Sequence, residues 1–376
     1  MAPDAPHALM IGGGIAGLAS AIALGNRGWR CTVLERDPGR RRRGQGLLLP
    51  PSGREALRAL GVTGLEASGT AIERFDLCHR DGRTQARFAI DGALGVLHRD
   101  LVALLERALP PTTTVVGCRC STLETSADGQ VRAVASEDGR RWRGDLIVGA
   151  DGVRSTCRQR LFPEARLTPT LTTELVLAIE APDLARRLGH SCRKYQDAQA
   201  GLALGLLPSG RGHLVLFAQF DTGRHAPSAE TPALELLRRH FSGWNPLLDG
   251  LLADLQPTNA HLWHTTDLDP LPRLHHGNLV LVGDSGHPLL TITSQGVASA
   301  LVDALELQAV LDGLTPRDPA ALRAALERYS NRRLPVLREL VREGRAKRQQ
   351  FLRPVGTGTA LSAPLVGYGH REAEPA

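Results

Sequence analysis

The sequence is poor in aromatic residues and in lysine. Aromatic residues make up 4% of the 376 residues, which argues against a binding site built as an aromatic cage. Lys194 and Lys347 are the only lysines, so the basic side of a net charge of +6 is almost entirely arginine. No zinc finger, RNP motif or basic stripe interleaved with aromatic residues accompanies this charge, and we expect no nucleic-acid partner. With 42% hydrophobic and 22% charged residues, the composition excludes a disordered or collagen-like chain.

Paired cysteines and long apolar runs are also missing. Six cysteines in 376 residues are too few for a disulfide framework, and they contain no C-x-x-C pair that would provide a metal-ligand set: Cys31, Cys78, Cys118, Cys120, Cys157 and Cys192. We therefore predict no metal site and a reduced, cytoplasmic setting. No run approaches the roughly 20 apolar residues that cross a membrane, so we predict no membrane span.

The first 35 residues predict a dinucleotide-binding unit, with a strand at 8–11, a helix at 18–27 and a second strand at 30–35. Gly12, Gly14 and Gly17 form a G-x-G-x-x-G pattern, which permits a tight turn, a close approach of a pyrophosphate and close packing of helix on strand. Glu35 ends the second strand, where such units place the acid that binds a ribose. A plain structural turn is the alternative interpretation, and this unit alone does not separate NAD from FAD.

Two later segments bring polar residues to the end of an apolar strand. The first reaches a D-G pair at Asp151, and the second reaches a G-D pair at Asp284. A helix predicted over about 297–311 follows Gln295 and Gly296, and the N–H groups at its start could stabilise negative charge. Either segment alone is also typical of an ordinary strand end, with Asp151 acting as a helix cap.

Together the three motifs resemble the FAD-dependent aromatic hydroxylases of the p-hydroxybenzoate hydroxylase type, which are single-component flavoprotein monooxygenases. The resemblance spans about residues 8 to 350, with the motifs in the family's order. It implies an α/β fold, with a discontinuous Rossmann-like FAD-binding domain and an inserted antiparallel-sheet substrate domain. We assign 1–75, 97–165 and 273–335 to the first domain, 76–96 and 166–272 to the second, 336–353 to a C-terminal helix and 354–376 to a loose tail.

The resemblance also assigns roles to single residues. Glu35 would hold the adenosine ribose, Asp284 the ribityl chain, and Arg99 would lie near the phosphate and ribityl part of FAD. Asp151 would contribute to cofactor binding and to binding of the pyridine nucleotide. The complete set implied for FAD is Gly12, Gly14, Gly17, Glu35, Arg36, Arg43, Arg99, Asp151, Asp284, Gln295, Gly296 and Val297. Arg43 ends an arginine run that fits a solvated basic loop equally well.

The sequence departs from the family pattern beside the reactive part of the flavin. Thr291 stands where the family usually has proline, and Ala298 where it often has asparagine. Val302 replaces a common acidic residue, although Asp303 follows it. These departures bear on oxygen insertion more than on FAD binding.

The substrate half is less clearly marked. Strands predicted at 174–180, 201–207 and 213–220 would form a sheet that roofs the flavin ring. Which face lines the pocket stays open, so Phe217, Gln219 and Phe220 are not assigned to either face. His213, Tyr195 and His264 are the candidates for binding or deprotonating a phenol, although each also fits a structural hydrogen bond.

Two further features have structural interpretations. His287 follows the G-D pair, and we interpret it as part of the loop structure instead of as the catalytic base. Residues 320–351 predict arginine-rich helices with a break near Pro335, whose basic face is either solvated or attracts NAD(P)H.

The resemblance implies a monooxygenase that consumes NADH or NADPH and hydroxylates a phenolic or electron-rich aromatic substrate through a flavin C4a-hydroperoxide. Molecular oxygen would be the second substrate, and the protein would be a monomer or a homodimer. Two alternatives remain: a flavin-dependent reductase or oxidase that inserts no oxygen, and a non-enzymatic FAD-binding protein. The sequence fixes neither the substrate nor the choice between NADH and NADPH.

Overall fold

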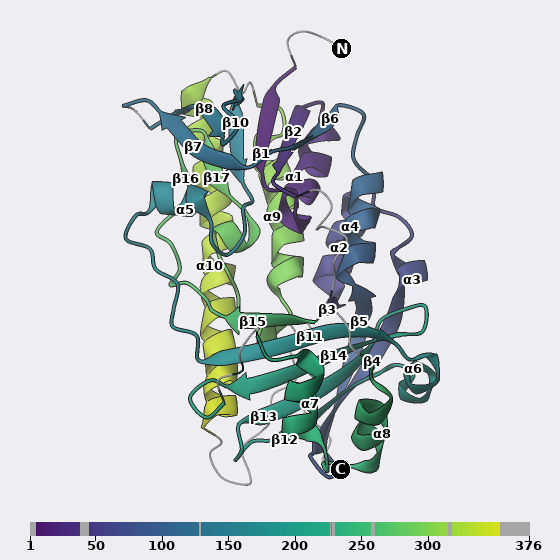
Figure 1. Cartoon of the computed structure of the whole chain (residues 1–376). Coiled ribbons are helices and arrows are strands. Elements are labelled where there is room, and N and C mark those ends of the chain that lie inside the picture. The colour runs from purple at the N-terminus through teal and green to yellow at the C-terminus, as the bar shows by residue number, and fades with distance from the viewer. Residues whose placement is uncertain are drawn as a thin grey trace.

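The computed structural model describes residues 5–37, 45–127, 129–225, 227, 230–256, 260–314 and 318–353. Arg43 and the predicted tail over 354–376 lie outside these ranges. Figure 1 shows a helix-covered sheet at the N-terminal end of the molecule and a larger sheet below it, with α10 (Pro319–Leu352) running beside both.

The upper sheet has six strands, and its central strands are parallel and buried. Its strand order is β16-β17-β10-β1-β2-β6, and every pair is parallel except β16 with β17. The strands come from distant parts of the chain: β1 (His7–Ile11), β2 (Arg30–Glu35), β6 (Thr113–Gly117), β10 (Leu146–Gly149), β16 (His275–His276) and β17 (Leu279–Leu281). Buried parallel strands need apolar side chains on both faces, which accounts for the unbroken apolar run of residues 8–11.

Helices cover this sheet and share its core. Side chains of α1 and α9 pack against the strands, and α10 adds Leu326, Tyr329 and Leu337 to the same cluster. The helices of this half are α1 (Ile15–Gly25), α2 (Pro51–Ala59), α3 (Leu65–Ser68), α4 (His98–Arg107), α5 (Thr156–Leu161) and α9 (Gly296–Leu311). A small sheet of β7 (Cys120–Thr125), β8 (Val131–Ser136) and β9 (Arg141–Trp142) lies beside them.

The lower sheet has eight strands in the order β15-β11-β14-β13-β12-β4-β5-β3. Neighbouring strands in this order pair antiparallel, except β12 and β4, which pair parallel. The strands are β3 (Gly46–Leu49), β4 (Gly69–His79), β5 (Thr84–Leu97), β11 (Thr172–Glu180), β12 (Ser191–Asp197), β13 (Leu202–Pro208), β14 (His213–Asp221) and β15 (His261–Thr265). On one face the sheet packs against α6 (Pro182–Leu188), α7 (Ala233–Phe241) and α8 (Pro246–Asp254).

The predicted fold class is confirmed, with an α/β FAD-type half and a sheet-based second half. Two features differ from the sequence prediction. Strand β12 was not expected, because Ser191–Asp197 is rich in polar residues. The predicted break near Pro335 is wrong: α10 is continuous, and buried Arg333, Leu334 and Leu337 on either side of this proline hold the helix in place.

The division into domains remains a prediction. The hairpin of β4 and β5 belongs to the lower sheet from Gly69 to Leu97. Strand β3 (Gly46–Leu49) pairs with β5 and therefore joins the same sheet.

Candidate active site

The glycine-rich loop between β1 and α1 leaves its outer side open. Gly12 has a φ of 109°, and a Cβ there would lie 2.3 Å from the carbonyl oxygen of Ala150. A Cβ on Gly17 would lie 1.9 Å from the carbonyl oxygen of Gly12, so only glycine permits this helix–strand contact. A Cβ on Gly14 would meet no atom within 4 Å. The backbone before α1 is therefore accessible to a ligand, and the helix start can attract a phosphate.

Glu35 is tied to this loop. Its Oε2 accepts a hydrogen bond from the backbone N–H of Gly13 at 2.7 Å, and its Oε1 accepts one from Asp37 N at 2.9 Å. The acid at the end of β2 therefore lies directly beside the glycine turn, as ribose binding requires. Arg36 follows it and is exposed to solvent.

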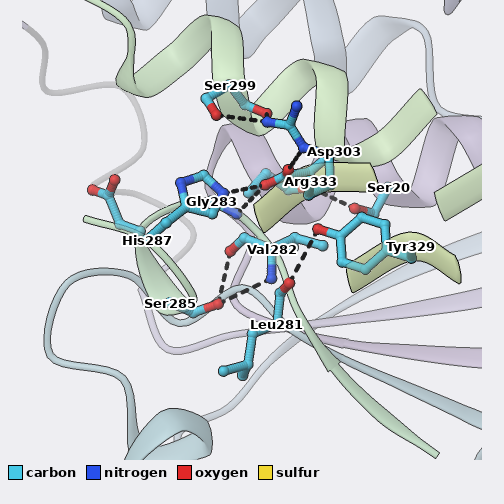
Figure 2. Close-up of polar contacts among 12 residues, drawn as sticks. Ser20, Leu281, Val282, Gly283, Ser285, His287, Ser299, Asp303, Tyr329 and Arg333 are labelled. Carbon is cyan, nitrogen blue, oxygen red and sulfur yellow. Dashed lines mark hydrogen bonds and ion pairs between the residues drawn. The ribbon is translucent and has the colours of Figure 1, made fainter. Parts of the chain in front are cut away.

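A buried ion-pair network fixes the loop that carries Asp284 from the interior of the protein. Asp303, on α9, accepts hydrogen bonds from the backbone N–H of Gly283 at 2.7 Å, from His287 Nε2 at 2.5 Å and from Arg333 Nε at 2.6 Å. Figure 2 shows the His287 and Arg333 side chains converging on this carboxylate. Burial alone would raise the pKa of Asp303, but its interactions with His287 and Arg333 lower it to about 2.

The network shows where His287 and Asp303 lie relative to the loop. His287 is a buried partner of Asp303 within the loop. Asp303 is the acidic residue that follows Val302, and it fixes the loop from the interior. Neither side chain is among those that line the cavity described below.

The D-G segment is joined to the same loop by Arg158. Its guanidinium donates to the carbonyl oxygens of Asp284 at 3.1 Å and Ser285 at 2.9 Å. Asp151 accepts hydrogen bonds from the backbone N–H groups of Thr156 at 2.7 Å and Cys157 at 3.1 Å at the start of α5. The N-cap position itself is held by Ser155, so Asp151 supports the helix start from four residues before it, and its neighbour Gly152 lines the cavity.

Asp284 and the start of α9 face each other. A Cβ added to Gly296 would lie 4.0 Å from Asp284 Oδ1. The Asp284 side chain is exposed to the cavity but enclosed by protein elsewhere, and this desolvation raises its pKa despite nearby His287 and Arg158. Gly296 and Val297 line the cavity, whereas Gln295 is buried at the helix start.

One cavity of about 570 Å³ connects these elements with the lower sheet. At one end it is lined by Gly14, Asp284 and Gly296. At the other it is lined by side chains of β11, β12 and β14 and by the last turns of α10. The glycine loop and the G-D loop therefore open onto one continuous space, as a cofactor that reaches from one to the other requires.

The strand register settles which face of the lower sheet meets the cavity. Phe217 and Gln219 of β14 line it, whereas Phe220 is buried against α7 on the other face. Val176 of β11, paired with Phe217, lies on the cavity face as well. Successive strand residues point to opposite faces, so the register fixes every other position too.

A polar chain crosses this otherwise apolar face. Gln219 Nε2 donates to Glu174 Oε1 at 2.8 Å, and Gln219 Oε1 accepts from Lys194 Nζ at 2.5 Å. Burial raises the pKa of Glu174, against the opposing effect of hydrogen bonds from Gln219 and Thr291. Thr291, which replaces the family proline, therefore supports an acid in the cavity wall.

The predicted catalytic residues do not line this cavity. Tyr195 points into the hydrophobic cluster under α7 and α8. His264, which pairs with Thr173, is exposed. The next pair along the two strands, Glu174 and Trp263, lines the cavity instead. His213 Nε2 lies 2.9 Å from Arg99 at the edge of the sheet. The strand period turns Tyr195 and His264 to the opposite face of the sheet. His213 shares the face of Phe217 and Gln219 but lies at the start of β14, outside the cavity lining, so our proposal uses other residues.

Arg99 contacts His213 and is not among the cavity-lining residues, so its place near FAD remains a prediction. The preceding residue, His98, lines the cavity in its place. Burial lowers the pKa of His98, and its Nδ1 has no hydrogen-bond partner among the described residues. This orphaned polar atom fits a site that receives a polar ligand.

Comparison with known proteins identifies the class. A family described as FAD binding domain matches residues 6–344. The 3-amino-4-hydroxybenzoate 2-monooxygenase PtnB3 of Streptomyces platensis is 31% identical over 382 residues, which cover 93% of this chain and 90% of the relative. The chain therefore belongs to the FAD-binding family of FAD-dependent monooxygenases, of the aromatic hydroxylase type.

Two solved structures agree with this assignment. HpxO of Klebsiella pneumoniae, complexed with FAD and uric acid, superposes with a TM-score of 0.81 at 26% identity, covering 93% of this chain and 89% of HpxO. PqsL of Pseudomonas aeruginosa, in complex with 2-aminobenzoylacetate, gives 0.77 at 25% identity, with 92% and 96% covered. This protein is accordingly an enzyme and a flavoprotein, which sets aside the non-enzymatic alternative.

The residues present fit FAD. The open backbone at Gly14, the enclosed carboxylate of Asp284 and the start of α9 share one cavity. No group of three His, Cys, Asp or Glu side chains in the described ranges is arranged to hold a metal ion. Among the helices that the structure describes, none is long and apolar enough to cross a membrane.

Proposed function

We propose that this enzyme uses NADH or NADPH to reduce FAD and hydroxylates a phenolic or otherwise electron-rich aromatic ring. The observation that carries the proposal is the single cavity that joins the glycine loop and Asp284 to the substrate-facing side of the lower sheet. The names of similar proteins support it, since they record 3-amino-4-hydroxybenzoate, urate and 2-aminobenzoylacetate as molecules acted on or bound. A cytoplasmic location and a monomeric or homodimeric state are part of the proposal.

In this proposal the two ends of the cavity have separate tasks. Bound FAD would supply the redox and oxygen-activating chemistry. The glycine loop and Glu35 hold its adenosine and phosphate part, and Asp284 binds the polyol chain. The start of α9, at Gly296 and Val297, directs backbone N–H groups and a positive dipole end at developing negative charge.

The sheet face positions the substrate. Val176, Phe217 and Leu207 give it apolar walls that exclude water from the reacting ring. Glu174, Lys194 and Cys192 are the ionisable side chains of the sheet that line the cavity, and burial raises the pKa of the Cys192 thiol to about 12. Glu174 and Lys194 therefore take the place of His213, Tyr195 and His264 as candidates for handling a phenolic proton. Both lie within the chain of hydrogen bonds through Gln219.

The test has two stages. Purified protein is reconstituted with FAD and screened with aromatic compounds for ligands that accelerate NADH or NADPH oxidation. The product of the best compound is then analysed after turnover under labelled oxygen. We expect one labelled oxygen atom in the product; a protein that does not retain FAD contradicts the proposal at its first stage.

A reductase or oxidase that inserts no oxygen is the second candidate. Thr291 and Ala298 favour it, because both depart from the family pattern in the loop and first turn that face the flavin site. Ala298 is buried and cannot hydrogen-bond through its side chain. Stimulated NAD(P)H oxidation with hydrogen peroxide as the sole oxygen product would favour this candidate.

A further inference from the structure

The two lysines of the chain meet in the cavity. Of 45 basic residues, 43 are arginine, and the other two are Lys194 on β12 and Lys347 on α10. Both line the substrate end of the same cavity, although they are far apart in the sequence. A chain that uses arginine almost everywhere else thus places both of its ammonium groups at one site.

The contacts of the lysines bring their ammonium groups close to each other. Lys194 Nζ lies 5.7 Å from the ring centroid of Phe351, while donating to Gln219. Lys347 lies one helical turn before Phe351, on the same side of α10, and its side chain is 8% exposed. The two positive charges are near enough for Lys194 to help lower the pKa of Lys347.

The charges around this end of the cavity sum to a positive value. Lys194, Lys347 and Arg353 line it. Arg348 lines a small adjoining cavity next to Glu174, and its Nη1 has no hydrogen-bond partner among the described residues. In the part of the chain that the structure describes, Glu174 on β11 and Glu343, one turn before Lys347 on α10, are the carboxylates whose charge acts on the lysines. The local excess of positive charge suits a negative ligand.

We propose that Lys194 and Lys347 form an anion subsite that binds a carboxylate carried by the aromatic substrate. The inference rests on the proposed function, because it places this carboxylate at the end of the cavity away from Asp284. The apolar wall of Val176 and Phe217 then receives the ring. Glu174, held by Gln219 and Thr291, keeps one ammonium group in place before the substrate arrives.

Lysine suits this task better than arginine. Burial lowers the pKa of both Lys194 and Lys347 to about 8, so each retains its charge at neutral pH with little margin. A bound carboxylate would relieve the repulsion between them and restore their pKa values. Arginine stays charged at any accessible pH, whereas a lysine in the empty site can release its proton as the pH rises above about 8.

The test measures binding instead of turnover. FAD-reconstituted protein is titrated with matched acids and amides: benzoate and benzamide, 4-hydroxybenzoate and 4-hydroxybenzamide, 2-aminobenzoate and 2-aminobenzamide. Perturbation of the flavin absorption spectrum gives the dissociation constants. We expect at least one acid to bind about tenfold or more tightly than its amide, since hydrogen bonds to charged groups add that much.

Variants decide which residues produce the preference. Lys194→Gln and Lys347→Gln should each reduce the preference for the acid about tenfold and leave amide binding within a factor of about two. Lys347→Arg should keep most of the preference. Arg338→Gln, at an exposed position of the same helix, is the control and should keep all of it.

The outcomes separate this inference from the proposed function. Equal binding of acids and amides, or no binding of any acid by protein that holds FAD, overturns the carboxylate subsite while leaving the monooxygenase assignment intact. A preference that survives both lysine variants also overturns it. Absence of labelled product, with FAD retained and the acid preference intact, overturns the proposed function instead.

Discussion

The two ends of the cavity are built by different means. At the glycine-loop end, the ligand-facing surface is backbone: the turn at Gly12, the open side of Gly14 and the start of α9. At the sheet end, the surface is side chain, from Glu174, Lys194 and their neighbours. The first end depends on a few positions where only glycine fits, and the second on which face of each strand meets the cavity. The comparison teaches that the cofactor end tolerates little change, whereas the substrate end can be altered residue by residue.

The largest effect is expected at the backbone end, from Gly17→Ala. The new Cβ would lie 1.9 Å from the carbonyl oxygen of Gly12, a backbone atom that cannot move without opening the glycine turn. We expect complete loss of FAD retention, measured as the ratio of flavin to protein absorbance after reconstitution. Circular dichroism shows whether the protein still folds.

Gly250→Ala is the matched control for this substitution. Gly250 is exposed within α8, and a Cβ there meets no atom within 4 Å. This variant should bind FAD normally and gain about 0.5–1 kcal/mol in the free energy of unfolding. Wild-type flavin content in Gly17→Ala would contradict the close contact that defines the turn.

The second-largest effect is expected from Asp303, whose side chain supports the loop that carries Asp284. Asp303→Asn leaves the buried Arg333 guanidinium without its carboxylate and weakens the hold on Gly283. We expect a loss of about 3–5 kcal/mol in the free energy of unfolding, measured by urea denaturation, together with weaker FAD binding. Glu306→Gln, which breaks the exposed pair with Arg332, should lose no more than about 1 kcal/mol. Similar losses in both variants would show that the buried network does not support the loop.

Ligand binding at the sheet end of the cavity should depend on pH, whereas binding at the glycine-loop end should not. Lys194 and Lys347, each with a pKa of about 8, carry charge below that pH and lose it as the pH rises. The groups that face them are Glu174, Cys192 and Glu343, and the pKa of Cys192 is raised to about 12 by burial, so it stays neutral over this range. Binding of the tightest aromatic acid should therefore be constant up to about pH 8 and weaken above it, by up to about tenfold per pH unit.

Two controls sharpen this pH profile. The matching amide should bind equally at all pH values between 7 and 9.5. In a Lys194→Arg, Lys347→Arg double variant, the weakening should disappear, because arginine does not lose its proton in this range. A profile that is the same for acid and amide would assign the titration to some group other than the lysines.

The glycine-loop end of the cavity could be predicted from the sequence, because a position without room for a side chain has to be glycine. Gly12 and Gly17 are required where they stand, Gly14 completes the pattern on the open side of the turn, and Asp284 could be located from the apolar strand before it. The buried partners of that loop were less visible: Asp303 was noted only as the neighbour of Val302. Its role depends on α9 turning that side chain inward toward Gly283.

The sheet end could not be predicted in the same way. The sequence of a strand shows its two-residue period but not which of its two faces meets the ligand. Strand β12 was missed because it presents Lys194 and Gln196 to the cavity and therefore lacks the usual apolar alternation. Lys194 was therefore seen only as a rare residue type, and Lys347 as part of a basic helix. His264 and Tyr195 were chosen for their chemistry, while their positions were decided by register. His213 lies at the start of β14, outside the cavity lining.

The smallest effect is expected from His264→Gln and Tyr195→Phe, and for that reason these variants test the register most directly. His264 lies one position from Trp263 and Tyr195 one position from Lys194, yet both point away from the cavity. Removing their ionisable groups should change kcat/KM for the best substrate by less than about twofold, well below the 10²–10⁴-fold expected for a true acid–base residue. Glu174→Gln, on the cavity face, provides the contrast and should reduce kcat/KM by about tenfold or more. If His264→Gln instead matched the loss in Glu174→Gln, the strand face assigned to the substrate would be the wrong one.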